Sequence, residues 1–194
     1  DTYGDGIFIG SEDGGFSENV RIDGAWIDNA RRNGISITSA KNIYVHRVLI
    51  SNTFGHDPQC GIDIEPSWYK DVIENVNITN VYTFNNALAG IEINMQELNN
   101  PLVVNPKSIG INISNHTDNM SKHALLTSLH GANRTKYDVK GNINIMNSKW
   151  LNSKDTNIWI NPNDYNIKMN FKDIQIKDTI WKSRTLFKDE VKGK

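Results

Sequence analysis

The stretch Cys60-Gly-Ile-Asp-Ile-Glu-Pro66 contains a short motif that recurs along this chain at nearly constant spacing. Its copies are Gly6–Ile9, Gly34–Ile37, Gly61–Ile64 and Gly90–Ile93, and they begin 28, 27 and 29 residues apart. A repeat period of about 20–50 residues is typical of folds built from stacked units. The spacing of this motif therefore predicts that the chain winds into coils, with one copy in each coil.

Each copy predicts a short strand in which both isoleucines face one side and the residue between them faces the other. If consecutive copies stack, the isoleucines form a ladder inside the protein. The outward positions then form two columns, which are Phe8, Ser36, Asp63 and Glu92, and Gly10, Thr38, Glu65 and Asn94. Carboxylates thus gather at adjacent levels of an outer face that we expect to be exposed.

Two further strand types accompany the motif. The second type is Asn19–Ile22, Asn42–Val45, Asn75–Ile78, Gly110–Ile113, Asn142–Ile145 and Asp173–Ile176, and the third is Ala25–Asn29, Val48–Asn52, Val81–Asn85 and Trp150–Asn152. Three short strands per period, with polar corners, are typical of a parallel β-helix, here of about six to seven coils. Asparagine suits such corners because it tolerates left-handed backbone angles, and stacked asparagines can form ladders along the helix.

The repeat is less regular in the second half. We expect residues 1–194 to form a single domain, with regular coils over 1–98, longer loops over 99–187 and a polar tail over 188–194. The stretch His123–Thr127 stands where the next motif copy is expected, and Asn157–Ile160 and Thr185–Phe187 are expected to continue the series. The first copy already lies within the repeat and no N-terminal cap precedes it, so we expect a fragment of a longer β-helix.

Composition excludes several classes of protein. The net charge of −1 and the pI near 6.6 argue against binding to nucleic acid, which favours a visibly basic chain. No apolar run is long enough to predict insertion into a membrane. The single cysteine, Cys60, excludes an intrachain disulfide framework and is expected to pack at a strand start.

The stretches Gly4–Gly10, Arg32–Ile37 and Gly61–Pro66 resemble repeats of the pectate-lyase-like superfamily of right-handed parallel β-helices. The resemblance covers about residues 4–94. It implies a right-handed coil, a carbohydrate substrate, and an extracellular, secreted or virion-surface location. The superfamily includes polysaccharide lyases, glycoside hydrolases, epimerases and phage tailspike depolymerases, so the reaction stays open. Narrower family signatures are missing: Gly55–Asp57 approaches a Gly-His-Gly motif, and Trp26–Asn29 matches a lyase motif in three of four places.

Asp63, Glu92 and Glu65 are the candidate catalytic residues. Neighbouring coils lie about 4.8 Å apart, and residues two apart on one strand lie about 6.6 Å apart. Like charges held this close raise one pKa, which leaves one carboxyl protonated as an acid and another ionised as a base. Glycoside hydrolysis needs such a pair, with Asp63 and Glu92 as acid and base and Glu65 assisting. The alternative is that all three belong to an ordinary solvated sheet face.

A Ca²⁺ site at Asp63, Glu65 and Glu92 is a further possibility, because carboxylates and the Asn94 amide are suitable hard ligands. Calcium would favour a lyase or epimerase acting on a uronic-acid polymer. A basic side chain would then abstract the proton, and the candidates are Arg31, Arg32, Lys41 and Arg47.

Other side chains are candidates for substrate binding. His56 and Asp57 lie in the predicted loop before the acidic strand, where function often resides. Trp68 and Tyr69 follow that strand and could stack on a sugar ring. The remaining candidates are Arg32, His46 and Asn94. An ordinary surface or turn role is the alternative for each histidine, and Trp150, Trp159 and Trp181 are expected to be structural or to lie between subunits.

The sequence thus predicts a protein that acts on an extracellular or capsular polysaccharide, most simply as a hydrolase. The enzymatic alternative is a calcium-dependent lyase or epimerase. The non-catalytic alternative is a glycan-binding or structural segment of a fibre or adhesin. A homotrimer is an option because tailspike-type β-helices associate laterally.

Overall fold

The computed structural model describes residues 4–11, 13–98, 107–131, 139–161, 165–177 and 179–186, with the backbone alone described for the last range. The predicted polar tail 188–194 and residues 99–106 lie outside the described residues. Within the described ranges the chain is all-β, and its one short helix is the 3₁₀ turn η1 (Gln96–Leu98). No described helix is long and apolar enough to span a membrane.

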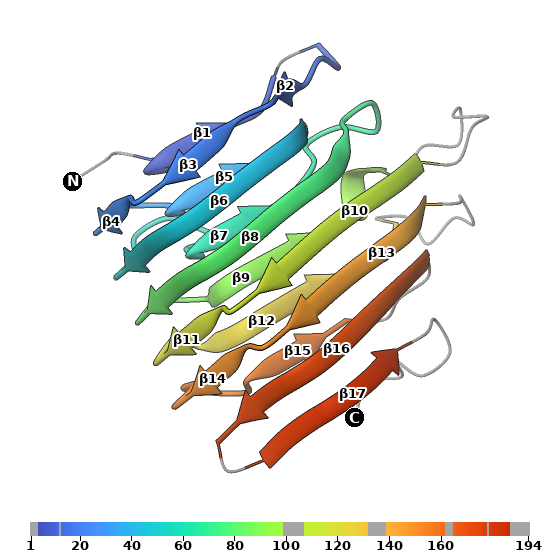
Figure 1. The fold of residues 1–194 in the computed structure, drawn as a ribbon. Helices are drawn as coiled ribbons and strands as arrows, with labels where there is room; N and C mark the ends of the chain where they lie inside the picture. Colours follow the sequence, from blue (N-terminus) through green and yellow to red (C-terminus); the bar gives the residue numbers. More distant parts are fainter. Residues whose placement is uncertain are drawn as a thin grey trace.

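Two parallel sheets stack the strands of consecutive coils, as in a parallel β-helix (Figure 1). The six-stranded sheet contains the motif copies and their continuation: β1 (Ile7–Ile9), β5 (Ile35–Ile37), β7 (Ile62–Ile64), β9 (Ala89–Asn94), β12 (His123–Ser128) and β15 (Ile158–Ile160). The prediction that His123–Thr127 and Asn157–Ile160 continue the series is therefore confirmed.

The eleven-stranded sheet holds the second and third strand types. Its members are β2 (Ser17–Glu18), β3 (Arg21–Asp23), β4 (Trp26–Asp28), β6 (Ala40–Ser51), β8 (Ile73–Phe84), β10 (Lys107–Ser114), β11 (Thr117–Asn119), β13 (Val139–Met146), β14 (Lys149–Leu151), β16 (Asn166–Ile176) and β17 (Thr179–Leu186). In β6 and β8 the two predicted short strands form one strand of 12 residues. The strand bends instead of ending because Arg47 and Asn80 adopt φ of 52° and 54° without interrupting the pairing of the flanking residues.

Two predictions for the last coils are wrong. Asp173–Ile176 was expected in the second strand position, but Lys168–Phe171 occupies it, and Gln175 and Ile176 pair with β14 in the third. Thr185 and Leu186 do not continue the motif series, because β17 pairs antiparallel with β16. The alternation of apolar residues did not identify Lys168–Phe171 as the second strand, because this segment carries Met169 and Phe171 where the other copies have isoleucine or valine.

The core lies between the two sheets and consists mainly of stacked β-branched residues. In the motif strands Ile35, Ile62 and Ile91 align in register and are each 0% exposed. The glycine of the motif is required because coils approach closely there: a Cβ on Gly61 would lie 2.6 Å from the carbonyl oxygen of Gly90. The motif therefore combines an interior ladder with a position where only glycine fits.

Asparagine ladders occupy the corners, as predicted. Asn42 Nδ2 donates to Asn19 Oδ1 at 3.1 Å, and Asn75 Nδ2 donates to Asn42 Oδ1 at 2.8 Å. These three residues have φ of 58°, 55° and 52°. The left-handed angle turns the corner, and the amide connects one coil to the next. A second ladder runs along the sheet face through Asn77, Asn112, Asn144 and Asn170.

Substitution of Asn75 separates these two roles. Asn75→Gly removes the amide but keeps the backbone angle accessible, whereas Asn75→Ala removes both. Because a left-handed angle costs a residue with a Cβ about 1–2 kcal/mol, we expect Asn75→Ala to lower the free energy of unfolding by about 1 kcal/mol more than Asn75→Gly. Denaturant unfolding of both variants measures the difference. Equal losses would mean that the ladder bond alone matters at this corner.

Candidate functional site

The outward residues of the six-stranded sheet form one column across neighbouring strands. Ser36 pairs in register with Asp63, and Asp63 pairs with Glu92, as the repeat predicted. The column continues to Leu126 and Trp159 in the next two strands. Register therefore brings Asp63 and Glu92 to adjacent levels, and we refer to Asp63, Glu65 and Glu92 as the acidic face.

The expectation that this column is exposed is wrong for its middle. Asp63 and Glu92 are 2% and 6% exposed, whereas Phe8 and Trp159, at the two ends, are 59% and 45% exposed. Glu65, which directly follows β7, is half-buried. The two aligned carboxyls are thus largely removed from water, which disfavours their charged forms.

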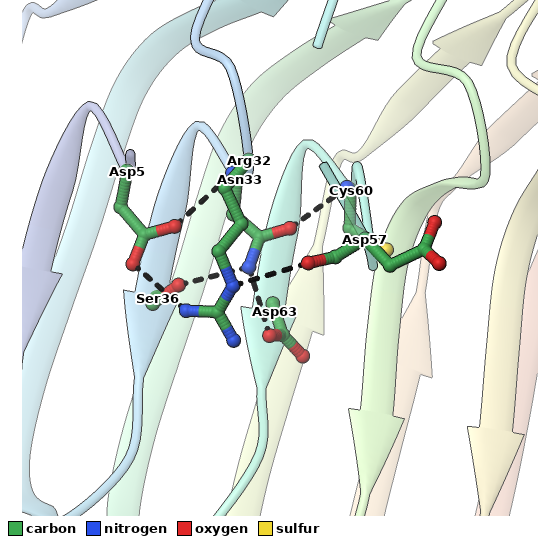
Figure 2. A network of polar contacts seen from close by, with 7 residues as sticks. All are labelled: Asp5, Arg32, Asn33, Ser36, Asp57, Cys60 and Asp63. Carbon is green, nitrogen blue, oxygen red and sulfur yellow. Dashed lines mark hydrogen bonds and ion pairs between the residues drawn. The ribbon is translucent and has the colours of Figure 1, made fainter. Parts of the chain in front are cut away.

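The burial has an identifiable cause in the turn before each strand (Figure 2). Asn33 Nδ2 donates to Ser36 Oγ at 3.0 Å and to Asp63 Oδ2 at 2.9 Å. Asn33 Oδ1 accepts from the backbone N–H of Cys60 at 2.9 Å. This one buried asparagine connects two coils and fixes one oxygen of Asp63.

Arg32 contributes the positive charge next to the acidic face. Its Nη1 lies 3.3 Å from Asp5 Oδ2, and its Nε donates to the carbonyl oxygen of Asp57 at 3.2 Å. Asp5 also accepts from the backbone N–H of Asn33 at 3.1 Å. Arg32 is therefore anchored to the loops on both sides of its own turn.

The other two carboxyls have neutral partners. Cys60 Sγ donates to Glu92 Oε2 at 3.2 Å, and Asn94 Nδ2 donates to Glu65 Oε1 at 2.8 Å. Cys60 is fully buried, and burial together with the charge of Glu92 raises the pKa of its thiol. Cys60 is therefore a neutral donor to Glu92, in agreement with its predicted packing role at a strand start.

Burial is the largest cause of the raised pKa of all three acids. For Asp63 burial is the largest cause, followed by the charges of Glu65 and Glu92, and the pKa rises well above its ordinary value. The pKa of Glu92 is raised chiefly by burial, which outweighs the bond from Cys60. The pKa of Glu65 is also raised by burial, but Arg32 and the Asn94 bond oppose the rise.

This arrangement separates two chemical roles. Asp63 is the group most strongly favoured to hold a proton, and among the described residues no donor reaches its Oδ1. Glu65 is the most accessible of the three and has neighbours that favour its ionised form. A carboxyl that favours its protonated form and one that favours its ionised form, two residues apart and thus about 6.6 Å apart along an extended chain, can act as a general acid and a general base.

The three carboxylates are not arranged as the calcium site considered above. Across the described ranges no three His, Cys, Asp or Glu side chains gather closely enough to hold a metal ion. Burial explains this result, since Asp63 and Glu92 direct oxygens at Asn33 and Cys60.

His56 and Asp57 lie, as predicted, in the loop before the acidic strand, between β6 and β7. Both are exposed. The backbone N–H of His56 donates to the carbonyl of Arg31 at 2.8 Å, and Asp57 Oδ1 accepts from Gln59 Nε2 at 2.6 Å. The loop thus packs on the turn that carries Arg32.

Trp68 and Tyr69 lie in the loop that follows Glu65. Their rings make a T-shaped contact with centroids 5.0 Å apart, and Lys70 Nζ lies 4.5 Å from the Trp68 centroid. Trp68 is 39% exposed. Asp71 holds this loop by accepting from the backbone N–H of Trp68 at 2.9 Å.

His46 faces outward beside Tyr44, as predicted, but it belongs to β6 of the other sheet. Lys41 and Arg47 lie on the same strand and form ion pairs with Glu74 at 3.9 Å and Asp23 at 2.7 Å. The structure does not bring these three residues to the acidic face, because the two sheets face opposite sides of the coil (Figure 1).

A buried polar chain was not predicted from the sequence. Trp150, which is fully buried as expected, donates from Nε1 to His116 Nδ1 at 3.2 Å. His116 Nε2 therefore carries the proton and donates to Thr83 Oγ1 at 2.8 Å, and Thr83 donates to Asp118 Oδ1 at 2.7 Å. Ser121 donates to the same oxygen at 2.6 Å. We refer to these five residues as the core network.

Register was the signal that could have located the core network. Thr83 aligns with Ile50 of the previous coil, and Asp118 and Trp150 follow in the same inward column. The short strand Thr117–Asn119 has no isoleucine, so alternation did not identify it. Burial lowers the pKa of His116 to about 3 and raises that of Asp118 to about 6.

Comparison with known protein families, with curated proteins and with solved structures found no match for this chain.

The raised pKa of Asp63 predicts how stability depends on pH. A carboxyl whose pKa is raised in the folded state stabilises the fold at low pH, and this contribution is lost as pH rises through the folded value. We expect Asp63→Asn to raise the melting temperature at pH 7.5 and to weaken its dependence on pH, since the amide oxygen still accepts from Asn33. Asp28→Asn is the matched control with the opposite sign, because bonds from Ser51 and Asn52 lower the pKa of Asp28. Thermal melts from pH 5 to 8 that show no gain for Asp63→Asn would contradict a buried, protonated Asp63.

In the core network two titrations oppose each other between about pH 4 and 7. Asp118, with a folded pKa of about 6 against 3.8, gains about 2–3 kcal/mol of stability on acidification, while His116, at about 3 against 6.5, loses about 3 kcal/mol. We expect Asp118→Asn to remove the gain, so that the variant loses about 2–3 kcal/mol relative to the parent between pH 7 and 4. Denaturant unfolding at both pH values measures this, and parallel losses in the two proteins would rule it out.

Proposed function

We propose that this chain is a carbohydrate-active β-helix protein that hydrolyses glycosidic bonds of an extracellular or capsular polysaccharide. Membership of the pectate-lyase-like superfamily is part of the proposal and rests on the repeats of residues 4–94. The observation that carries the proposal is the acidic face, in which Asp63 is driven toward its protonated form and the partly exposed Glu65 is not driven as far.

In this mechanism Asp63 is the general acid and Glu65 the general base. Asp63 gives its proton to the glycosidic oxygen as the bond to the sugar breaks, and Glu65 takes a proton from the attacking water. A separation of about 6.6 Å between residues two apart in an extended chain fits the range of about 6.5–9.5 Å that an inverting reaction needs. Glu92 supports the pair through its charge, which helps to keep Asp63 protonated. The first assignment, with Glu92 as base, is less favourable because Glu92 is buried and bonded to Cys60.

This mechanism requires that the substrate can reach Asp63. Asp63 is 2% exposed, so the turn that carries Arg32 and Asn33 has to shift when substrate enters. Trp68 and His56 flank the two ends of β7 and would contact sugar rings on either side of the scissile bond. Apo active sites often have catalytic contacts that rearrange on binding, so this burial is compatible with the role.

The burial of Asp63 and Glu92 specifically favours a second candidate, a non-catalytic glycan-binding or fibre segment. In that case the acidic face is a structural polar column, and the protein binds a glycan or assembles, as a homotrimer for example, without turnover. A uronan lyase has less support, because Lys41 and Arg47 lie on the other sheet and Arg32 is paired with Asp5.

A panel of neutral, amino and uronic-acid polysaccharides tests the reaction class. Reducing ends report hydrolysis, and ultraviolet absorbance of a new double bond reports a lyase, each measured with and without a calcium chelator. We expect reducing ends without absorbance and without an effect of chelation. Absorbance that chelation abolishes would replace the hydrolase by a lyase, and no signal in either channel would favour the binding segment.

Substitutions at the acidic face test the residue roles. Asp63→Asn and Glu65→Gln should each lower kcat by about 10²-fold or more, because each removes one side of the acid–base pair. Glu74→Gln, on the other sheet, is the matched control and should retain full activity. Activity should also fall as pH rises through the raised pKa of Asp63, since the acid then loses its proton. Unchanged turnover in both variants would exclude this assignment.

A further inference from the structure

We propose that the acidic face selects saccharides that carry a positive charge, namely polymers with free amino groups on the sugar ring, and that Glu97 is the residue that recognises this charge. This inference rests on the proposed glycan-directed function and adds a substrate class and a specificity residue to it. Four features of the described residues support it.

The first feature is the sign of the local charge. Among the described residues, the charges of Glu65, Glu92 and Asp5 add to burial in raising the pKa of Asp63, and the charge of Arg32 opposes them. The guanidinium of Arg32 also opposes the rise in the pKa of Glu65. Within the described residues, the acids around the face therefore outnumber the bases that influence it.

The second feature is that Arg32 is already engaged. Its Nη1 is paired with Asp5 at 3.3 Å, and its Nε donates to the Asp57 carbonyl at 3.2 Å. Nε and Nη1 are therefore available to a substrate carboxylate only if these contacts break. A uronic acid would then meet excess negative charge without a prepared partner, whereas an ammonium group would be attracted.

The third feature is the position of Glu97. It lies in η1, directly after β9, and it is exposed. Asn94 joins it to the acidic face, because Asn94 donates to Glu65 Oε1 at 2.8 Å and accepts from the backbone N–H of Gln96 at 3.2 Å. Burial is the largest cause of the raised pKa of Glu65, and the charge of Glu97 adds to the rise against the opposing charge of Arg32. An ammonium group between the two carboxylates would relieve this repulsion.

The fourth feature is an unpartnered carboxyl oxygen. Asp63 is 2% exposed, and in the described part of the chain its Oδ1 has no hydrogen-bond partner. Figure 2 shows Asn33 bonded to the other oxygen alone. In the proposed mechanism Oδ1 therefore carries the proton, and a buried donor without an acceptor is unfavourable. A sugar hydroxyl or glycosidic oxygen that passes Glu65 would accept this hydrogen bond, so the oxygen marks a ligand site next to Glu65.

The test compares three soluble oligosaccharides of equal length: a glucosamine oligomer, its fully N-acetylated counterpart and a galacturonate oligomer. Binding is measured by calorimetry and turnover by reducing ends, at pH 6 and low salt. We expect the glucosamine oligomer to bind about fivefold more tightly than the N-acetylated one, with no measurable binding of galacturonate. The preference should shrink as ionic strength rises, because salt screens charge pairs.

Glu97→Gln should abolish the preference by weakening binding of the glucosamine oligomer about fivefold, through KM and not kcat, while the N-acetylated oligomer is unaffected. Glu74→Gln, an acid on the other sheet, is the matched control and should keep the preference. Since Glu97 is exposed, its substitution is not expected to disturb folding.

The two proposals fail in different ways. Binding of the glucosamine oligomer without release of reducing ends would remove the hydrolase and leave the charge selectivity in place. Equal handling of the amino and N-acetylated oligomers, or a preference that survives Glu97→Gln, would overturn the inference even if hydrolysis occurs. Tighter binding of galacturonate would also overturn it and would indicate Arg32 as the partner of the substrate carboxylate.

Discussion

The structure depends on one constraint, which is that successive coils pair edge to edge in a fixed parallel register. Register places Ile35, Ile62 and Ile91 on top of one another, and the hydrogen bonds between strands hold them there. A shift of one residue would turn each isoleucine outward and bring the polar residue between them into the core. Because a shift would carry this penalty in every coil, the register is kept even though the loops vary in length.

The same register that aligns the core residues also aligns polar side chains into columns. Whether these side chains can bond to one another depends on their place in the coil. At the corners, asparagines stack into ladders in which each amide donates to the previous coil. On the outer face of the six-stranded sheet, Asp63 and Glu92 stack with no such complementarity, since two carboxylates cannot donate to each other. Asn33 and Cys60 supply the missing donors, and by doing so they bury the acids.

This burial changes the chemistry that a row of acids can perform. An exposed row would be ionised and would attract metal ions, whereas burial raises the pKa of these acids, which are not arranged as a metal site within the described residues. The core network follows the same principle on the inside. His116 is kept neutral by burial, and Trp150 determines which of its nitrogens carries the proton.

The sequence by itself determined the parallel β-helix, the inward ladder, the asparagine corners and the alignment of Asp63 with Glu92, because all of these follow from a period of 27–29 residues and the alternation of a strand. It did not determine the placement of Lys168–Phe171, where Met169 and Phe171 replace the isoleucines of the pattern. It also did not predict that Asp63 is buried, that His46 and Arg47 lie away from the acidic face, or that Asp118 points into the core. Only the tertiary structure decided these points. Burial and proton affinity depend on side chains that turns and neighbouring coils bring together, and the alternation within one strand does not predict those contacts.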